Sequence, residues 1–233
     1  GFSPDDTVAV GGEVFLVGLD ANGKAQLWKT DGTAGGTIQV TSFTNGVNAQ
    51  NIAAFGNKAL FDGMDANGHY QLWLSDGTST GTVQLTSSSN NLDPTNIISL
   101  GSTAVFFGND ANGHQQMWVT DGTVAGTTQL TTSTIGYTLV DLTAYGNKAL
   151  FYRPDNNGKY QLWITDGTAV GTVALTSNLN ISFRQAIHES IAISGNQAVF
   201  TAQGPDGLQT LWVTDGTVAG THELTGITNA AFR

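Results

Sequence analysis

One ten-residue stretch occurs five times in this chain and constrains its fold more than any other feature. The first copy reads Trp-Lys-Thr-Asp-Gly-Thr-Ala-Gly-Gly-Thr and starts at Trp28. The later copies keep the Trp, the Asp-Gly-Thr and the closing Gly-Thr, and they start at Trp73, Trp118, Trp163 and Trp212. A repeat period of about 45 residues is typical of solenoids and propellers rather than of an ordinary globular domain. The sequence therefore predicts five structural repeats of one kind.

The residues around each motif predict four short antiparallel strands. In the second repeat, residues 52–55 lead into a Gly-Asn turn, and residues 58–61 lead into an Asp-x-Asn-Gly turn. Residues 70–73 and 82–86 then flank the Asp-Gly-Thr loop. Asn-Gly between two strand-like runs is a strong hairpin signal. Because neighbouring strand residues point to opposite faces and both Leu72 and Trp73 are apolar, both faces of the sheet are expected to be buried.

Five such repeats predict an all-β protein, a five-bladed β-propeller with four antiparallel strands in each blade. An open β-solenoid is the alternative, but four turns per repeat suit a meander better than a coil. We expect a single domain over residues 1–233, with blades at 7–41, 52–86, 97–131, 142–176 and 191–225. The two tails, residues 1–6 and 226–233, are expected to close the ring. Truncation of either tail should then lower thermal stability.

The charge and the cysteine content of the chain limit the classes of binding partner and of metal site that it can have. Eight Lys and Arg residues against 18 Asp and Glu residues give a formal charge of −10, which is unfavourable for binding nucleic acid or an anionic membrane surface. The absence of cysteine excludes disulfides and thiolate metal sites. The sequence has no apolar run that could span a bilayer, and it starts at Gly1 without a signal-like leader. We expect no nucleic-acid partner, no membrane insertion, and a monomeric domain of a larger protein.

The segments between the repeats differ most from one another, and they form the predicted binding face. They span residues 42–50, 87–95, 132–140 and 177–189. In a propeller of this strand order they share one rim with the Asp-x-Asn-Gly turns, and loops on a rigid scaffold commonly carry recognition. Aromatic rings beside Asn and Asp suit a sugar, which offers an apolar face and several hydroxyl groups. The candidate ligand-binding residues are Phe43, Asn45, Asn48, Asn90, Asn91, Asp93, Tyr137, Phe183, Arg184 and His188.

Two sets of these polar and aromatic residues also have a purely structural interpretation. The aromatic rings of Phe43, Tyr137 and Phe183 fit equally well as packing plugs between blades. A short oxygen-bearing side chain precedes each predicted first strand, at Asp6, Asn51, Asn96, Asp141 and Ser190. These five residues predict either a polar ring at the mouth of the central channel or local caps that bind their own backbone. The caps are favoured, because they explain all five copies without a ligand.

Metal binding is not favoured by any pattern in the sequence. The Asp-x-Asn-Gly turns resemble the start of a calcium loop but lack its further oxygen ligands. Their aspartates are therefore expected to be turn residues, with calcium as the lesser alternative: Asp20, Asp65, Asp110 and Asp155. The aspartate of Asp-Gly-Thr is expected to cap its own loop. The four histidines do not follow a zinc spacing, so no metal and no cofactor are predicted.

Catalysis is not favoured either. A glycosidase requires two carboxyl groups that face each other, and Glu189 with Asp141 is the sole pair expected near the channel mouth. The near-equivalence of the blades argues against one unique catalytic centre. We therefore predict that the protein is not an enzyme.

The repeat Leu-Trp-x-Thr-Asp-Gly-Thr-x-x-Gly-Thr resembles the bacterial repeat family named for ELWxxDGT. The match covers all five copies, and its departures are Gln or Thr before Leu-Trp, Met117 in place of Leu, and Ser75 in place of Thr. This resemblance implies a secreted or cell-surface bacterial propeller. A looser likeness, in repeat length and blade number but not in motif, is to five-bladed lectins of the tachylectin type.

Together these features predict a non-enzymatic binding module that is lectin-like. Several weak carbohydrate sites on one rim would gain strength through multivalency on a glycan or polysaccharide. The alternative is a structural or protein-interaction domain of a larger bacterial surface adhesin, which would bind a surface protein. A glycosidase is the least favoured function.

Overall fold

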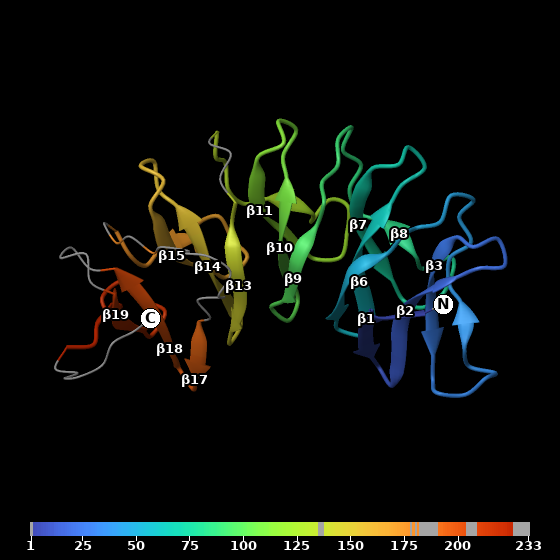
Figure 1. Ribbon diagram of the computed structural model, residues 1–233, viewed down its shortest axis with the longest axis horizontal. Helices are drawn as coiled ribbons and strands as arrows, with labels where there is room; N and C mark the ends of the chain where they lie inside the picture. Colours follow the sequence, from blue (N-terminus) through green and yellow to red (C-terminus); the bar gives the residue numbers. More distant parts are fainter. Residues whose placement is uncertain are drawn as a thin grey trace. The chain divides into compact units, whose positions relative to one another are not determined.

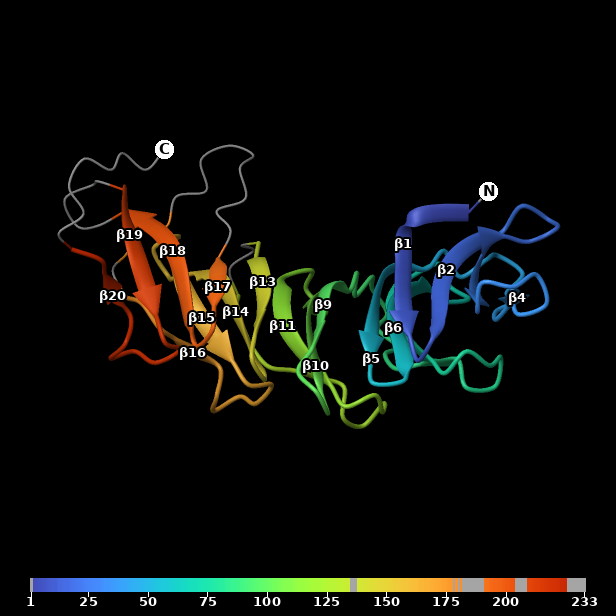
Figure 2. The same cartoon turned by 90° about the horizontal axis from the view of Figure 1, so that it is seen from below.

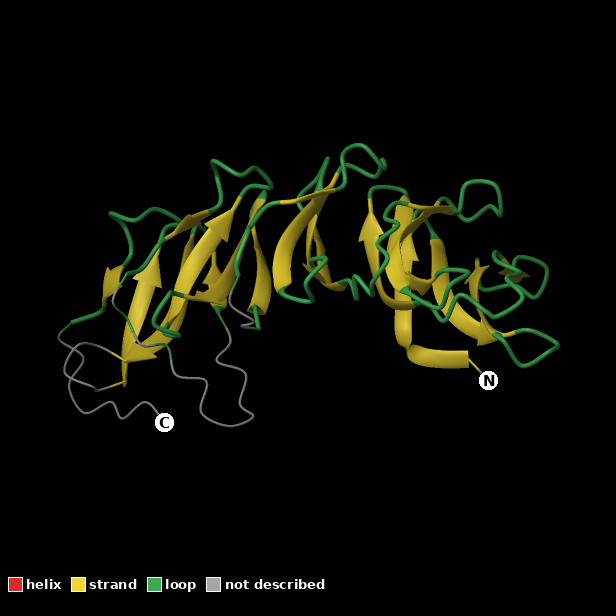
Figure 3. Cartoon of the chain, turned by 90° about the horizontal axis from the view of Figure 1, so that it is seen from above, coloured by secondary structure: helices red, strands yellow, loops and turns green. Residues whose placement is uncertain are grey.

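The computed structural model describes residues 2–134, 138–177, 179, 181, 191–203 and 209–225, with the backbone alone for residues 2–6. In these residues it contains only strands, turns and loops, arranged in five sheets of four antiparallel strands (Figures 1 and 3). The chain divides into two compact units, residues 1–133 with three sheets and residues 134–233 with two. The predicted all-β architecture of four-stranded antiparallel repeats is confirmed, and the single domain stays a prediction.

In each sheet the strands follow one another in chain order, as in a meander. The first unit contains the first sheet, β1 (Phe2–Val10), β2 (Glu13–Leu19), β3 (Ala25–Thr30) and β4 (Ile38–Gln39); the second sheet, β5 (Gln50–Phe55), β6 (Lys58–Met64), β7 (Tyr70–Ser75) and β8 (Val83–Gln84); and the third sheet, β9 (Thr95–Ser99), β10 (Ala104–Asn109), β11 (Gln115–Thr120) and β12 (Thr128–Gln129).

The second unit contains the fourth sheet, β13 (Val140–Tyr145), β14 (Lys148–Pro154), β15 (Tyr160–Thr165) and β16 (Val173–Ala174), and the fifth sheet, β17 (Ala192–Ser194), β18 (Gln197–Gln203), β19 (Gln209–Thr214) and β20 (His222–Glu223). The fourth strand of every sheet is only two residues long, which is shorter than predicted. The tail after residue 225 lies outside the described residues, so the ring-closing role of the two tails stays a prediction.

Both faces of the second sheet are buried, as the sequence predicts. Phe61 and Trp73 pack with Phe15 and Leu27 of the first sheet. On the opposite face, Leu60 packs against the third sheet as part of a separate buried cluster. The first strands of consecutive sheets, β1, β5 and β9, are neighbours in the first unit (Figure 2). The sheets of this unit therefore stack face to face, with apolar side chains between them.

The Asp-Gly-Thr loop closes on its own aspartate. In the second sheet, Asp76 Oδ1 accepts hydrogen bonds from the Thr78 hydroxyl at 2.7 Å and from the Thr78 N–H at 2.8 Å. Thr78 Oγ1 accepts in turn from the N–H of Gly81 at 2.9 Å. The hydrogen bond from the Thr78 side chain, with that from its backbone, lowers the pKa of Asp76. The same contacts recur in the other four loops, which confirms the predicted cap.

Three of the residues predicted to precede a first strand lie inside it instead. Asn51, Asn96 and Asp141 occupy the points where the strand register shifts, and their φ angles are 50°, 52° and 55°. A β-bulge of this kind places one residue in the left-handed conformation. Asn and Asp adopt that conformation more readily than most other residues, because their short polar side chains can form local hydrogen bonds. The backbone therefore explains the polar residue at these three positions without a ligand.

The predicted polar ring is described only in part. The side-chain amide of Asn51 is used within the protein, because its Nδ2 donates a hydrogen bond to the carbonyl of Pro94 at 3.2 Å. Asp6 lies in β1, where only the backbone is described, and Ser190 lies outside the described residues. The ring at a channel mouth stays a prediction.

Candidate functional site

A pocket of about 380 Å³ opens between the first and second sheets of the first unit. Its walls come from the loop after β4, from the Asp-x-Asn-Gly turn after β6, and from β7 and β8. The lining residues are Phe43, Thr44, Asn45, Gly46, Met64, Asp65, Ala66, Trp73 and Gln84. A variable loop and a hairpin turn thus meet at one site, on the rim where the sequence predicts binding.

A buried glutamine holds the loop that carries Phe43. Gln26 Oε1 accepts from the hydroxyl of Thr41 at 2.9 Å and from the N–H of Phe43 at 3.2 Å. Its amide Nε2 donates to the Phe43 carbonyl at 2.7 Å and to Asp20 Oδ2 at 3.3 Å. One side chain therefore ties the third strand, the following loop and the hairpin turn together, and it fixes the backbone of Phe43.

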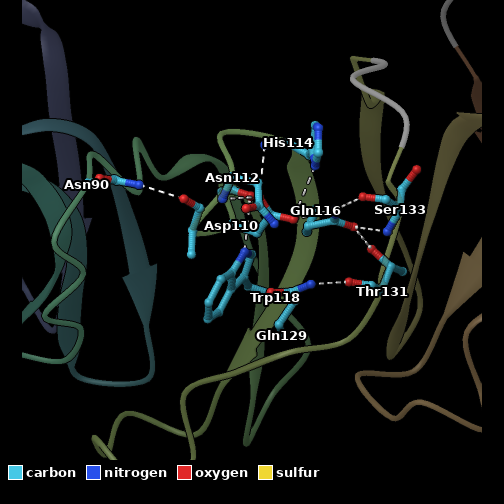
Figure 4. Close-up of polar contacts among 11 residues, drawn as sticks. Asn90, Asp110, Asn112, His114, Gln116, Trp118, Gln129, Thr131 and Ser133 are labelled. Carbon is cyan, nitrogen blue, oxygen red and sulfur yellow. Dashed lines mark hydrogen bonds and ion pairs between the residues drawn. The ribbon is translucent and has the colours of Figure 1, made fainter.

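Figure 4 shows the same arrangement around Gln116 of the third sheet. Gln116 Nε2 donates to Asp110 Oδ2 at 3.2 Å and to the Ser133 carbonyl at 2.9 Å, while Oε1 accepts from Thr131 Oγ1 at 3.0 Å. The first four sheets have a buried glutamine at this position, and the fifth has Thr210. In the sequence this glutamine is visible only as a departure from the ELWxxDGT motif.

Two aromatic rings form the apolar wall of the pocket. The ring centroids of Phe43 and Trp73 are 5.3 Å apart with a tilt of 47°. Trp73 is only 8% exposed, and its Nε1–H donates to the Gly63 carbonyl at 2.9 Å, which fixes the indole. Phe43 remains 38% exposed. Phe43 therefore packs against a neighbouring sheet and still offers apolar surface to the pocket, so the two interpretations of this ring are compatible.

Asp65 supplies an open carboxylate oxygen. Its Oδ1 accepts from the backbone N–H groups of Asn67 and His69 at 2.8 and 2.9 Å, as in the other turns. The equivalent Asp20 and Asp110 also accept from their buried glutamine through Oδ2. In the second sheet this glutamine, Gln71, donates elsewhere, so Asp65 Oδ2 has no partner among the described residues.

Gln71 differs because of the loop that follows its sheet. Its Nε2 donates to the carbonyls of Ser88 and Asn90, both at 3.1 Å. The equivalent amides of the first and third sheets donate to one loop carbonyl and to the aspartate. A change in one inter-sheet loop thus frees a carboxylate oxygen in the neighbouring pocket.

The next boundary, between the second and third sheets, is built differently. Ser88 occupies the position of Phe43, so the exposed ring of the wall is missing, although Trp118 occupies the position of Trp73. Asn90 reaches across, and its Nδ2 donates to the Ala111 carbonyl at 2.7 Å (Figure 4). Asn45, the counterpart of Asn90, is exposed and makes no hydrogen bond within the described chain. The amide that closes the second boundary is therefore free at the first.

The other predicted ligand-binding residues do not line the pocket. Asn91 Oδ1 accepts from the N–H of Tyr70 at 2.9 Å, and Asp93 Oδ2 accepts from Asn109 Nδ2 at 3.1 Å. Asn48 and Asp93 have φ angles of 43° and 47°. Asn and Asp tolerate this left-handed backbone conformation, which accounts for these two residues without a ligand. The remaining candidates lie outside the described residues: Tyr137, Phe183, Arg184 and His188.

Trp73 and Asp65 were missed by sequence reasoning because both residue types recur in the repeat and were assigned structural roles. What distinguishes them comes from the two adjoining loops: Phe43 lies in the loop before the second sheet, and Gln71 donates to the loop after it. Nothing in the spacing of Trp73 or Asp65 could have shown this.

A second unusual residue is Asp62 on β6. It is 4% exposed, and its Oδ1 has no hydrogen-bond partner among the described residues. Burial, with repulsion from Asp93, raises the pKa of Asp62 to about 8. Register pairs Asp62 with Leu72, and the equivalent residues of the other sheets are Val17, Phe107, Tyr152 and Thr201. A carboxyl group thus stands where the other sheets have uncharged side chains.

Within the described ranges, no group of three His, Asp or Glu side chains is placed to hold a metal ion. The described part of the chain also contains no helix suited to crossing a bilayer. The side-chain oxygens of Asp20, Asp110 and Asp155 bind their own turns, in agreement with their predicted role.

No protein-family model and no curated protein matches the chain. Solved structures of similar fold include TolB from Acinetobacter baumannii, with 20% identity over 92% of this chain and 53% of that one and a TM-score of 0.50. A putative TolB from Agrobacterium tumefaciens gives 16% identity, 94% and 79% coverage, and a TM-score of 0.50. A puromycin hydrolase gives 15% identity, 97% and 41% coverage, and a TM-score of 0.52.

This likeness concerns the fold alone. It supports a β-propeller, and the five sheets are consistent with five blades. The chain spans 53% of the first of these structures and 41% of the puromycin hydrolase. The resemblance to ELWxxDGT repeats and to tachylectin-type lectins stays an expectation from the sequence.

Proposed function

We propose that this chain is a non-enzymatic binding module that takes a carbohydrate in the pocket between the first two sheets. The observation that carries the proposal is the meeting of an exposed aromatic ring, Phe43, with two uncommitted polar groups, Asp65 Oδ2 and the Asn45 amide. A pyranose has apolar C–H faces that stack on such a ring and hydroxyls that need paired donors and acceptors. A volume of about 380 Å³ suits a small ligand.

The proposal favours one site of this kind in the first unit over the several weak sites expected from the repeat. At the second boundary, Ser88 offers no aromatic surface and Asn90 is bonded to Ala111. Repetition of the scaffold therefore does not imply repetition of the site. A secreted or cell-surface location, expected from the motif, remains part of this proposal.

A protein partner is the second candidate, and a specific observation favours it. Three valines at the tips of Asp-Gly-Thr loops are strongly exposed: Val124, Val170 and Val218. Apolar side chains mark a protein interface when they form a contiguous patch, so these valines are the residues at which such a partner would be tested. A propeller-type interaction module is also compatible with the similar folds reported above. A partner that needs Val124 but not Phe43 would favour this second candidate.

Replacement of Phe43 by alanine tests the carbohydrate proposal. Loss of the stacking ring is expected to weaken binding of the glycans found on an array by roughly five- to thirtyfold, since aromatic contacts contribute on the order of 1–2 kcal/mol. Isothermal titration calorimetry with the array hits would measure the change. Val124→Ala is the control, because it removes exposed apolar surface outside the pocket. An array without hits, or equal affinities for the two variants, would contradict the proposal.

A further inference from the structure

The charges around the pocket suggest what kind of sugar would bind. Among the lining residues, Asp65 is the only ionisable side chain, and none is Lys, Arg or His. Lys24 approaches Gly46 through its Cβ at the edge of this region but does not line the pocket. The chain as a whole carries a formal charge of −10. The local and the overall charge therefore both disfavour an anionic ligand.

The bonding of Asp65 adds a directional requirement. Its Oδ1 is occupied by the two backbone donors of the turn, which leaves Oδ2 for a ligand. In the first and third sheets the corresponding Oδ2 accepts an amide N–H from Gln26 or Gln116. The second sheet lacks this internal donor, because Gln71 donates to Ser88 and Asn90. An N–H donor from the ligand would complete the same arrangement, and a charged one would give the stronger bond.

The aromatic wall is compatible with a cation as well. In the fourth sheet, the guanidinium carbon of Arg153 lies 4.9 Å from the ring centroid of Trp163. Trp163 occupies the repeat position of Trp73, and Arg153 occupies that of Gly63. In the second sheet Phe43 and Phe61 pack on Trp73 instead, and Val47 crowds Gly63, so the exposed ring of Phe43 is the aromatic surface left for a ligand cation. Ring faces attract a nearby ammonium group.

We infer that the pocket selects a sugar with a free, protonated amino group, which binds Asp65 Oδ2 while its ring stacks on Phe43. The inference rests on the proposed carbohydrate function and names its ligand class, an amino sugar rather than an N-acetylated or acidic one. Acetylation of the amine would remove the positive charge and add bulk beside Asp65. A uronic acid would place a second carboxylate near the first.

Three oligosaccharides of equal length test the inference with the full chain: oligomers of glucosamine, of N-acetylglucosamine and of a uronic acid. Calorimetry is performed at a pH that keeps the amines protonated. We expect the glucosamine oligomer to bind at least about tenfold more tightly than the N-acetylated one, as for one charge-assisted hydrogen bond. The uronic acid oligomer should not bind. Added salt should weaken glucosamine binding more than any residual N-acetylglucosamine binding.

Asp65→Asn is the decisive variant, and Asp110→Asn is its matched control. Both make the same change at the same position of an Asp-x-Asn-Gly turn, but only Asp65 lines the pocket. Asp65→Asn should remove the preference for glucosamine, and Asp110→Asn should retain it. Equal binding of the amino and N-acetylated oligomers by the unaltered protein would overturn the inference and leave the carbohydrate function intact. A failure of all sugars to bind would overturn the proposed function, and the inference with it.

Discussion

Replacement of Asp62 by leucine is expected to make the protein more stable at neutral pH. Asp62 is buried, its Oδ1 has no hydrogen-bond partner among the described residues, Asp93 repels it, and its pKa is raised to about 8. The unfolded chain releases this proton near the ordinary pKa of 3.8, whereas the folded chain retains it. Between these two values the folded state binds more protons, so the free energy of unfolding falls as pH rises, by at most about 1.4 kcal/mol per pH unit.

The stability contributed by Asp62 is therefore greatest below pH 3.8 and is lost as pH rises towards 8. Denaturant unfolding of the native and Asp62→Leu proteins from pH 4 to 9 would measure this. The difference between their free energies of unfolding should widen as pH rises and become constant above about pH 8. Asp62→Asn keeps the shape of the side chain but cannot ionise. The difference in free energy of unfolding between this variant and the native protein should therefore change with pH in the same way, but start from a different value at low pH. A difference that does not change with pH would mean that Asp62 is ionised in the folded protein.

Replacement of Gly36 by alanine should destabilise the first sheet strongly, while the same change at Gly35 should have little effect. A Cβ at Gly36 would lie 2.0 Å from Asp31 Oδ1, whereas a Cβ at Gly35 would meet no atom within 4 Å. The carboxylate of Asp31 is held by Thr33 and cannot move without losing these hydrogen bonds. We expect Gly36→Ala to lower the melting temperature by roughly 5 °C or more.

The pair Gly36→Ala and Gly35→Ala is well matched, because the two glycines are adjacent in one exposed loop. The other repeats support the contrast, since the position of Gly35 is occupied by Thr80, Ala125, Val170 and Ala219. The position of Gly36 is glycine in all five repeats. Differential scanning calorimetry of the two variants measures the effect, and equal melting temperatures would show that the loop adapts to a Cβ at either place.

The parts of the fold that could be predicted are those that depend on local contacts. The Asp-Gly-Thr loop closes within six residues, through Asp76, Thr78 and Gly81 in the second sheet, so its chemistry is fully contained in the motif. Turn positions and strand order followed from the same kind of local signal. The start of the first strands was less predictable, because the bulge at Asn51 extends the strand beyond the point where apolar residues end.

The pocket depended on contacts between repeats and was predicted only in part. Phe43 and Asn45 were identified because they interrupt the repeat with residues suited to sugars. Asp65 was not, because its difference from Asp20 and Asp110 arises from the amide of Gln71, six residues away, and from a loop nearly twenty residues beyond that glutamine. A side chain that changes partner leaves no trace in its own sequence position.

The two-residue fourth strands have a consequence for self-association. A sheet that ends in a long, unpaired strand offers its backbone to other chains, and short edge strands limit this hazard. In the first three sheets a glutamine of this strand covers the backbone further: Gln39, Gln84 and Gln129 donate through Nε2 to the carbonyls of Thr41, Thr86 and Thr131, at 2.6, 2.5 and 2.5 Å. The outer border of these sheets is thus a poor template for cross-chain pairing, even though Ile38 and Val83 are exposed along it.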